Sequence, residues 1–334
     1  MLRIAINGYG RIGRAVLRAI VQNGLEDRVQ VVAINDLGSH ETLAHLTQFD
    51  STYGRFPGTV ALEGDVLRAG KQSIRVLQER DATRLPWAEL GVDVVFECSG
   101  KFKKRDLAAQ HLEAGAGRIL MSHPLDTADL TVVYGVNHAL LNGSQRIVSN
   151  GSCTTNCLAP LAKALHEGVG IRQGLINTVH AYTNDQNLLD QNHSDLYRAR
   201  AAALSIIPTS TGAAKTIGLV LPELTGRLDG LAVRVPTPTV SLLDLTFTAE
   251  QATSVEAVNA LLRAAAEQSP VLECNTLPLV SSDFTAYPAS CIVDLTQTRV
   301  QGELVKVLAW YDNEWAFTLR MLDVALYWQS VANA

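Results

Sequence analysis

Cysteine is scarce in this sequence, and its spacing is irregular. Five cysteines occur in 334 residues, at positions 98, 153, 157, 274 and 291. An odd and irregular set does not form the framework of a disulfide-rich secreted protein, so we expect a reducing compartment. Cys153 and Cys157 are four residues apart, but no second pair of ligands accompanies them. We therefore expect no structural zinc site and no other bound metal.

Excess charge and long apolar runs are also missing. The formal net charge is −5 and charged residues make up 18% of the chain, which gives no reason to expect a nucleic-acid or anionic-membrane partner. No apolar run approaches the ~20 residues that span a bilayer. The chain enters a strand pattern at Leu2 without the regions of a signal peptide. We expect a cytoplasmic protein, and its length predicts two domains.

The first 36 residues carry the clearest structural pattern. A short apolar strand, residues 3–7, is followed by Gly8-Tyr9-Gly10-Arg11-Ile12-Gly13, a helical pattern over 14–21, and a second strand that ends before Asp36. Strand, G-x-G-x-x-G, helix, strand and acid form the fingerprint of a dinucleotide-binding βαβ unit. The three glycines would permit the turn, the approach of a pyrophosphate and helix packing. Asp36 would bind the ribose hydroxyls.

The alternation of strands and helices continues to about residue 150 and then changes. Strands are expected at 92–98, 118–122 and 131–135, with a helix at 105–114. Beyond residue 160 longer strand patterns appear, at 175–180, 231–234, 239–248, 291–295 and 304–311, with helices at 255–266 and 321–331. The fold class is therefore α/β: a Rossmann-type, doubly wound parallel-sheet domain, and an α+β domain with a mostly antiparallel sheet.

One segment, Ser149 to Pro160, concentrates reactive and anion-binding groups. It reads S-N-G-S-C-T-T-N-C-L-A-P, and a helix is expected from Thr154 to His166. A thiol at a helix N-terminus is favoured as thiolate, and nearby hydroxyl and N–H groups suit an anion. Taken alone, Cys153 is more often a buried packing residue, because free cysteines are among the most buried residues. Cys157 is expected to be such a packing residue.

Six blocks of the sequence together resemble the phosphorylating glyceraldehyde-3-phosphate dehydrogenases. They lie at 6–14, 34–37, 149–160, 178–186, 206–215 and 310–314. The resemblance covers nearly the whole chain, and S-C-T-T-N-C is highly specific to that family. It implies an NAD-binding Rossmann domain at 1–151, a catalytic domain at 152–314, and a C-terminal helix, 315–334, that packs back on the first domain. It also implies a homotetramer of glycolysis and gluconeogenesis.

The family's chemistry assigns roles to individual residues by resemblance. Cys153 would be the nucleophile, forming a thiohemiacetal and then a thioester with D-glyceraldehyde 3-phosphate, and His180 would be the base. Inorganic phosphate would release the acyl group as 1,3-bisphosphoglycerate. The residues that resemble contacts to the substrate's phosphate are Thr183, Arg198 and Arg234, and those to the attacking phosphate are Ser152, Thr154, Thr211 and Gly212. Those that resemble NAD contacts are Gly8, Gly10, Arg11, Ile12, Gly13, Asp36, Arg80, Ser122 and Asn313.

The sequence also departs from the family's pattern. Gly151 stands where alanine is usual, which predicts a looser backbone. His123 replaces another common alanine, and in this the sequence resembles the erythrose-4-phosphate dehydrogenases. Gln191-Asn192 replaces a Leu-Pro pair of many NAD-specific members, whereas Asp36 would repel the 2′-phosphate of NADP. We favour glyceraldehyde 3-phosphate, with erythrose 4-phosphate, used in pyridoxal phosphate biosynthesis, as the alternative. A non-catalytic binding protein on the same fold is a third hypothesis, which the full set of site residues disfavours.

Overall fold

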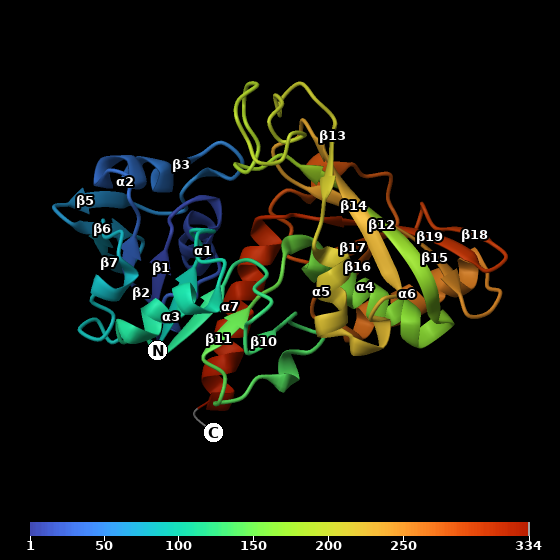
Figure 1. The fold of residues 1–334 in the computed structure, drawn as a ribbon, viewed down its shortest axis with the longest axis horizontal. Helices are drawn as coiled ribbons and strands as arrows, with labels where there is room; N and C mark the ends of the chain where they lie inside the picture. Colours follow the sequence, from blue (N-terminus) through green and yellow to red (C-terminus); the bar gives the residue numbers. More distant parts are fainter. Residues whose placement is uncertain (333–334) are drawn as a thin grey trace. The chain divides into compact units, whose positions relative to one another are not determined.

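The computed structural model describes residues 1–332, which divide into two compact units. The first comprises residues 1–132, 138–151 and 318–332, and the second comprises 133–137 and 152–317. Figure 1 shows the chain from its N-terminus in blue to its C-terminus in red. Each unit has its own sheet and its own apolar core.

The first unit is built on one sheet with strand order β10-β11-β9-β8-β1-β2-β7-β6-β5. The pairs from β10 to β7 are parallel, and β5, β6 and β7 form an antiparallel meander at the other edge. The strands are β1 (Leu2–Asn7), β2 (Val29–Asn35), β5 (Val60–Glu63), β6 (Val66–Ala69), β7 (Gln72–Leu77), β8 (Val94–Glu97), β9 (Arg118–Met121), β10 (Leu130–Thr131) and β11 (Ile147–Ser149). The predicted doubly wound parallel sheet is therefore confirmed.

Helices of the first unit pack against this sheet because its central strands are apolar on both faces. All four residues of β8 are buried, and so are most of β1 and β2. The helices are α1 (Arg11–Gln22), α2 (His40–Gln48), α3 (Arg105–Glu113) and the part of α7 (Trp315–Ala332) from residue 318 on. Trp328 of α7 donates from Nε1 to Asn142 O at 3.1 Å. Residues 333 and 334 of the predicted helix lie outside the described part of the chain.

The structure adds elements that the sequence patterns did not indicate, and it shortens one. Helix α2, the meander β5–β7 and the two-residue strands β3 (Phe49–Asp50) and β4 (Gly54–Arg55) were not predicted. The strand expected over 131–135 is only Leu130–Thr131. Beyond it the chain turns: Val133 N donates to Asn137 Oδ1 at 2.8 Å, and Gly135 has φ +82°. This hydrogen bond to Val133 N replaces the ladder pairing that an extended strand would give it.

The second unit contains a mixed sheet with order β13-β14-β12-β15-β19-β17-β16, and β18 pairs with β19. Most of its pairs are antiparallel, as predicted, whereas β12–β14 and β16–β17 are parallel. The strands are β12 (Ile171–Ala181), β13 (Ile207–Ser210), β14 (Leu228–Val235), β15 (Ser241–Ala249), β16 (Leu272–Asn275), β17 (Cys291–Asp294), β18 (Arg299–Gln301) and β19 (Leu304–Tyr311).

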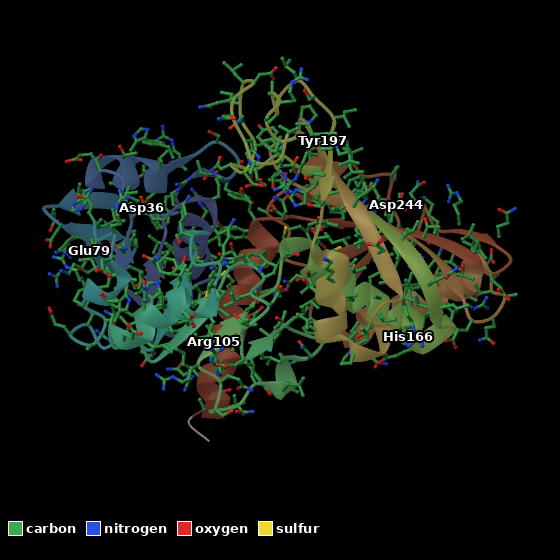
Figure 2. All side chains as sticks on the ribbon, in the orientation of Figure 1. Asp36, Glu79, Arg105, His166, Tyr197 and Asp244 are labelled. Atoms are coloured by element: carbon green, nitrogen blue, oxygen red, sulfur yellow. The ribbon has the colours of Figure 1, made fainter. Side chains whose placement is uncertain are left out.

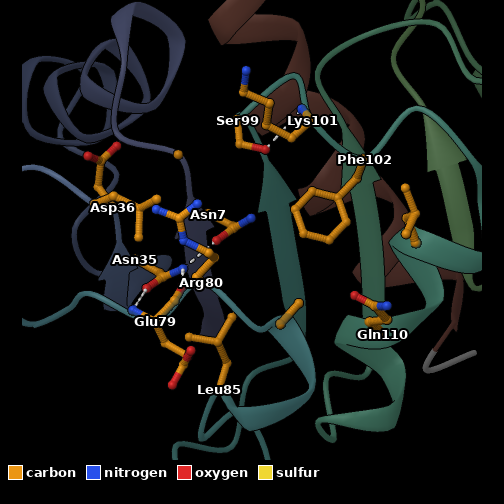
Figure 3. A pocket seen from close by; sticks show the side chains of 14 residues that line it. Asn7, Asn35, Asp36, Glu79, Arg80, Leu85, Ser99, Lys101, Phe102 and Gln110 are labelled. Carbon is orange, nitrogen blue, oxygen red and sulfur yellow. Dashed lines mark hydrogen bonds between the residues drawn. The ribbon is translucent and has the colours of Figure 1, made fainter.

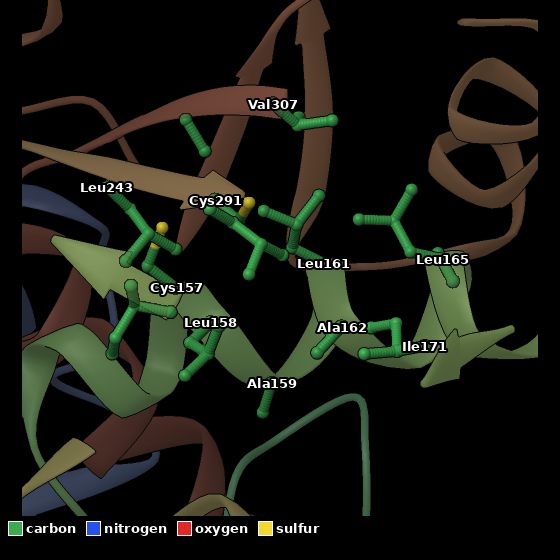
Figure 4. Packing of buried hydrophobic residues seen from close by; sticks show 14 of the residues in the cluster. Cys157, Leu158, Ala159, Leu161, Ala162, Leu165, Ile171, Leu243, Cys291 and Val307 are labelled. Atoms are coloured by element: carbon green, nitrogen blue, oxygen red, sulfur yellow. The ribbon is translucent and has the colours of Figure 1, made fainter. Parts of the chain in front are cut away.

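Helices α4 (Cys153–Val169), α5 (Ala213–Val220) and α6 (Val255–Gln268) gather along the sheet of the second unit (Figure 1). The core between them contains Leu158, Leu161 and Leu165 of α4 together with Leu243 and Val307 of the sheet. Figure 4 shows this packing, with the sulfur atoms of Cys157 and Cys291 inside it. Both thiols are fully buried. Cys157 is thus a packing residue, as expected, and α4 is anchored so that its N-terminus is held in a fixed position.

Candidate active site and cofactor cleft

Helix α4 begins at Cys153 because Ser152 caps it. Ser152 Oγ accepts a hydrogen bond from Thr155 N at 3.0 Å, which satisfies one of the free N–H groups of the first turn. Cys153 Sγ then lies 3.4 Å from His180 Nε2. His180 stands near the end of β12, and Arg234 of β14 is its partner in the parallel register. The two strands and the helix therefore place a thiol, an imidazole and a guanidinium in one cluster.

The second nitrogen of His180 contacts both a carbonyl and a cation. Nδ1 lies 2.7 Å from Ala181 O, and Arg234 Nη1 lies 2.8 Å from the same Nδ1. Arg234 Nη1 also donates to Ala181 O at 2.9 Å and to Thr183 Oγ1 at 3.4 Å. Arg234 Nε is buried and has no hydrogen-bond partner among the described residues. A buried guanidinium with an unused donor is suited to receive an anion.

Burial controls the protonation of this cluster. It raises the pKa of the Cys153 thiol, while the charge of Arg234 and hydrogen bonds involving Thr154 act in the opposite direction. Burial also lowers the pKa of His180 to about 3, and Arg234 adds to that shift. The lowered thiol pKa expected from the helix N-terminus is therefore wrong in sign, because desolvation outweighs the favourable charges. A thiolate here depends on its partners: Arg234 and the nearby imidazole.

A chain of buried hydroxyl groups lies behind the thiol. Tyr311 Oη is 2.9 Å from Thr154 Oγ1 and 2.7 Å from Thr178 Oγ1. The Tyr311 ring also meets His180 edge-on, with ring centroids 6.1 Å apart. The hydroxyl of Thr154 thus contacts Tyr311, and hydrogen bonds from Thr154 also act on the Cys153 thiol. The sequence pattern did not single out Thr178 or Tyr311, although they lie within the blocks at 178–186 and 310–314.

Among the other residues predicted to bind phosphate, Thr211 and Gly212 lie at the start of α5, whereas Arg198 is paired with carboxylates. Thr211 Oγ1 accepts from Ala213 N at 3.2 Å, and Gly212 is the N-cap of α5. Arg198, in contrast, forms ion pairs with Asp185 and Asp195 and donates to Thr209 Oγ1 at 2.8 Å. The structure therefore joins Arg234 to Thr183, whereas the charge of Arg198 is balanced by two carboxylates.

Asn313 is held in place by Ser241 at the start of β15. Ser241 Oγ donates to Asn313 Oδ1 at 3.1 Å and accepts from Ala181 N, the residue after His180, also at 3.1 Å. Asn313 is only 5% exposed. Asn313 stands in the turn before α7, and its amide is oriented through its carbonyl oxygen.

The glycines of the first unit have distinct roles in the turn between β1 and α1. A Cβ on Gly8, which has φ +89°, would lie 2.4 Å from the Ser99 backbone, and one on Gly13 would lie 2.3 Å from Gly8 O. A Cβ on Gly10 would meet nothing within 4 Å. Gly8 and Gly13 are thus required by packing, while the space in front of Gly10 is open for a ligand to approach.

A cavity of about 380 Å³ opens at the carboxyl ends of the strands of the first unit. Its lining includes three predicted residues, Gly8, Asp36 and Arg80, as Figure 3 shows for the last two. Both oxygens of Asp36 accept backbone N–H groups, from Tyr9 and Gly38, at 2.8 Å each. This fixes a carboxylate at the wall of the cavity, at the position where the fingerprint places a ribose. The residues present therefore fit a dinucleotide.

Further lining residues were missed by the sequence reading: Asn7, Leu37, Asn35, Glu79, Ala82, Leu85, Ser99, Lys101, Phe102, Leu107 and Gln110. Asn7 and Asn35 each end one of two neighbouring parallel strands, and this repeated asparagine is the sequence signal that could have pointed to them.

Two residues predicted to bind NAD are not among the cavity's lining residues and have other partners. Arg11 pairs with Asp50 at 2.5 Å, and Ser122 N donates to Glu97 O at 3.0 Å. Ile12 lies in the first turn of α1.

Within residues 1–332, no group of three or more His, Cys, Asp or Glu side chains is arranged to hold a metal ion. No helix in that part of the chain has both the length and the apolar character needed to cross a membrane.

The comparisons with known proteins agree with this geometry. Residues 2–105 match the family model described as glyceraldehyde 3-phosphate dehydrogenase, NAD binding domain, and residues 152–313 match the model described as its C-terminal domain. The chain is 58% identical over 325 residues to a glyceraldehyde-3-phosphate dehydrogenase of Pseudomonas aeruginosa, covering 97% of each chain. It is 57% identical over 328 residues to that of Xanthobacter flavus, covering 97% of this chain and 98% of the relative.

A chromosomally encoded glyceraldehyde-3-phosphate dehydrogenase of Cupriavidus necator is 56% identical over 328 residues, with the same coverage. The two family models together span most of the sequence, and the relatives match along almost their full length. The chain therefore belongs to the glyceraldehyde-3-phosphate dehydrogenase family and is an NAD-dependent oxidoreductase.

Proposed function

We propose that the protein oxidises D-glyceraldehyde 3-phosphate with NAD and inorganic phosphate to give 1,3-bisphosphoglycerate. The observation that carries this proposal is the 3.4 Å contact between Cys153 Sγ and His180 Nε2 at the capped start of α4, with Arg234 beside it. The relatives' names favour this substrate over erythrose 4-phosphate. The reaction serves glycolysis and gluconeogenesis.

The chain's own residues divide the chemistry into two steps. Cys153 passes its thiol proton to His180 Nε2 and its thiolate attacks the aldehyde carbon; His180 returns that proton to the resulting oxyanion, which gives a thiohemiacetal. His180 Nε2 then removes that hydroxyl proton as hydride leaves, so that a Cys153 thioester remains. NAD supplies the hydride acceptor. Attack of inorganic phosphate on the thioester carbonyl breaks the C–S bond and restores the thiolate.

Two anion-binding positions are assigned around Cys153. Arg234 and Thr183 bind the phosphate of the substrate; the contact of Arg234 with Thr183 Oγ1 and its unused Nε support this role. Ser152, the backbone N–H of Thr154, Thr211 and Gly212 receive the attacking phosphate, since both sets lie at helix starts. Arg198 contributes to the first position only after exchanging a carboxylate partner for phosphate.

Residues of the first unit are proposed to bind NAD. Gly8, Gly10 and Gly13 shape the turn at the pyrophosphate, together with Arg11 and Ile12. Asp36 and Arg80 serve the adenosine side. Ser122 and Asn313 complete the contacts. The proposed domain boundaries are 1–151 for NAD binding, with the C-terminal helix, and 152–314 for catalysis.

We further propose a homotetramer in the cytoplasm. The segment 182–206 exposes large apolar side chains that water does not favour: Leu188, Leu189, Leu196, Tyr197, Leu204 and Ile206 are each 62–84% exposed. Figure 2 shows Tyr197 in this segment. Leu175, Leu231 and Leu304 are also exposed, on strands of the second sheet. A cluster along the chain of exposed large apolar side chains is typical of subunit interfaces.

Steady-state assays with two aldehydes and two coenzymes test the proposal. NADH formation should require glyceraldehyde 3-phosphate, NAD and phosphate together, with a higher kcat/KM than for erythrose 4-phosphate or NADP. A rate that does not change when phosphate is omitted would refute the phosphorylating mechanism. A higher kcat/KM for erythrose 4-phosphate would transfer the assignment to the alternative substrate.

A further inference from the structure

The first unit buries a carboxylate behind the walls of its cavity. Glu97 is the last residue of β8 and is fully buried, and it does not line the cavity itself. Its ion-pairing partner within residues 1–332 is His111 of α3, with Nε2 3.1 Å from Glu97 Oε2. Trp87 Nε1 lies 3.0 Å from His111 Nδ1. An indole N–H only donates, so His111 Nδ1 accepts, and the ring proton that faces Glu97 is on Nε2.

A chain of side-chain amides runs from Glu97 to another wall of the cavity. Asn7 Nδ2 donates to Glu97 Oε2 at 2.5 Å, and Asn7 Oδ1 accepts from Asn35 Nδ2 at 2.7 Å. Asn35 also donates to Glu79 O and accepts from Glu79 N, both at 2.9 Å. A backbone N–H and C=O cannot exchange roles, so Glu79 fixes one end of this chain and Glu97 fixes the other. Each amide therefore has one satisfied orientation.

The second oxygen of Glu97 holds the loop that follows β8. Oε1 accepts the backbone N–H of Ser99 at 2.8 Å and also its hydroxyl, and Ser99 Oγ accepts Lys101 N at 3.2 Å. His111 supports the next residue of this loop, because its ring lies against that of Phe102 with centroids 4.9 Å apart. Ser99, Lys101 and Phe102 all line the cavity, as Figure 3 shows. One buried pair thus anchors this wall.

The anchored residues line the same cavity as Asp36 and Arg80, which are assigned to the adenosine half of NAD. We propose that Glu97 is a positioning residue for coenzyme binding, which fixes the walls of the cavity that receives this half. The proposal rests on that assignment of the cavity. Glu97 acts by preorganisation: without it the amide chain and the loop have to become ordered when the ligand binds, and this cost lowers affinity.

The variant Glu97→Gln cannot satisfy both walls, because an amide offers one acceptor and one donor group where the carboxylate offers two acceptors. If its nitrogen faces Asn7 and His111, donors meet a donor. Turning the Asn7 amide only passes this conflict along the chain to the backbone of Glu79, which cannot turn. If its nitrogen faces Ser99, the Ser99 N–H loses its acceptor. One wall is released in either orientation.

Binding of NAD and of ADP-ribose, which contains the adenosine half but no nicotinamide, tests this inference by titration calorimetry. We expect Glu97→Gln to weaken both ligands by the same factor, about tenfold, which is the scale of one buried group left without its partner. The KM for NAD should rise by that factor, while kcat at saturating NAD stays within about twofold, since uniform binding alone is lost. Cys153 and His180 belong to the second unit.

Ile119→Ala is the matched control for loss of stability. Ile119 is fully buried in β9 and packs in a core cluster that contains none of the residues of the Glu97 network. The substitution leaves a cavity in the same unit, so it should lower Tm. Both dissociation constants should stay at their wild-type values, measured at a temperature at which circular dichroism shows every variant folded.

Two variants at His111 keep the test decisive if Glu97→Gln does not fold. A glutamine can donate to Glu97 and accept from Trp87, so His111→Gln should keep both affinities within about threefold of wild type. A leucine can do neither, so His111→Leu should weaken NAD and ADP-ribose together by about tenfold.

Four results would overturn the inference: wild-type affinities in Glu97→Gln, a loss for NAD without a loss for ADP-ribose, an equal loss in Ile119→Ala, or equal affinities in the two His111 variants. Wild type that binds neither ligand would instead refute the cofactor assignment on which the inference rests.

Discussion

Substituting alanine for Gly10 and, separately, for Gly13 should distinguish an effect on NAD binding from an effect on packing within one turn. At Gly13 the new Cβ would lie 2.3 Å from Gly8 O and 3.0 Å from Ile6 Cγ2, so the backbone must move. Overpacking of this kind costs about 1–3 kcal/mol. For a domain of this size, that loss corresponds to a fall in Tm of roughly 3–10 °C.

At Gly10 the same substitution should leave stability almost unchanged. Its φ of −75° and ψ of −152° are open to any residue, and its Cβ would meet nothing within 4 Å. The free energy of unfolding should therefore stay within about 1 kcal/mol of wild type. The methyl group does occupy the space through which a pyrophosphate approaches, so NAD affinity should fall by about tenfold or more.

Thermal unfolding by circular dichroism, without nucleotide, gives the first quantity, and titration with NAD gives the second. Gly13→Ala should lower Tm, while Gly10→Ala should keep Tm and lose NAD affinity. The reasoning is refuted if Gly10→Ala lowers Tm as much as Gly13→Ala does. It is also refuted if Gly10→Ala binds NAD as tightly as wild type.

Three further substitutions test the second unit and its connection. His180→Asn should lower kcat by about 10²–10⁴. It should also move the pH profile of Cys153 alkylation by iodoacetamide to higher pH, because the thiolate loses the imidazole as a partner, and an unchanged profile would contradict this. Tyr311→Phe should destabilise by about 1–3 kcal/mol in urea unfolding, since two buried hydroxyls lose a partner. Gly151→Ala should cost about 1–2 kcal/mol because φ is +65°, and a neutral result would show that this backbone adapts.

The sequence predicted the fold best where local chemistry decides it. The glycines of the β1–α1 turn and Asp36 follow a pattern whose spacing already implies its structure, and buried strands such as β8 are apolar up to their last residue. The meander β5–β7 escaped prediction because its strands are only four to six residues long and their buried positions include polar or small side chains such as Gln72 and Ala69. Its existence depends on pairing with β2, which no local window contains.

The candidate site was predictable only in part, because long-range pairing creates it. Cys153 and Ser152 stand out locally as a capped helix start. In contrast, the contact of Arg234 with His180 arises from the parallel register of β12 and β14, 54 positions apart in sequence. The raised pKa of the Cys153 thiol likewise follows from its burial in the folded structure, which the local sequence at the helix N-terminus does not reveal.

A single-turnover experiment on the thioester is the most direct test of catalysis at Cys153. Wild type mixed with NAD and glyceraldehyde 3-phosphate, without inorganic phosphate, should form NADH in a burst of about one equivalent per active site and then stall. Added phosphate should start steady turnover, and Cys153→Ser should show no burst. Continued turnover without phosphate, or a full burst in Cys153→Ser, would contradict the acyl-carrier role of this residue.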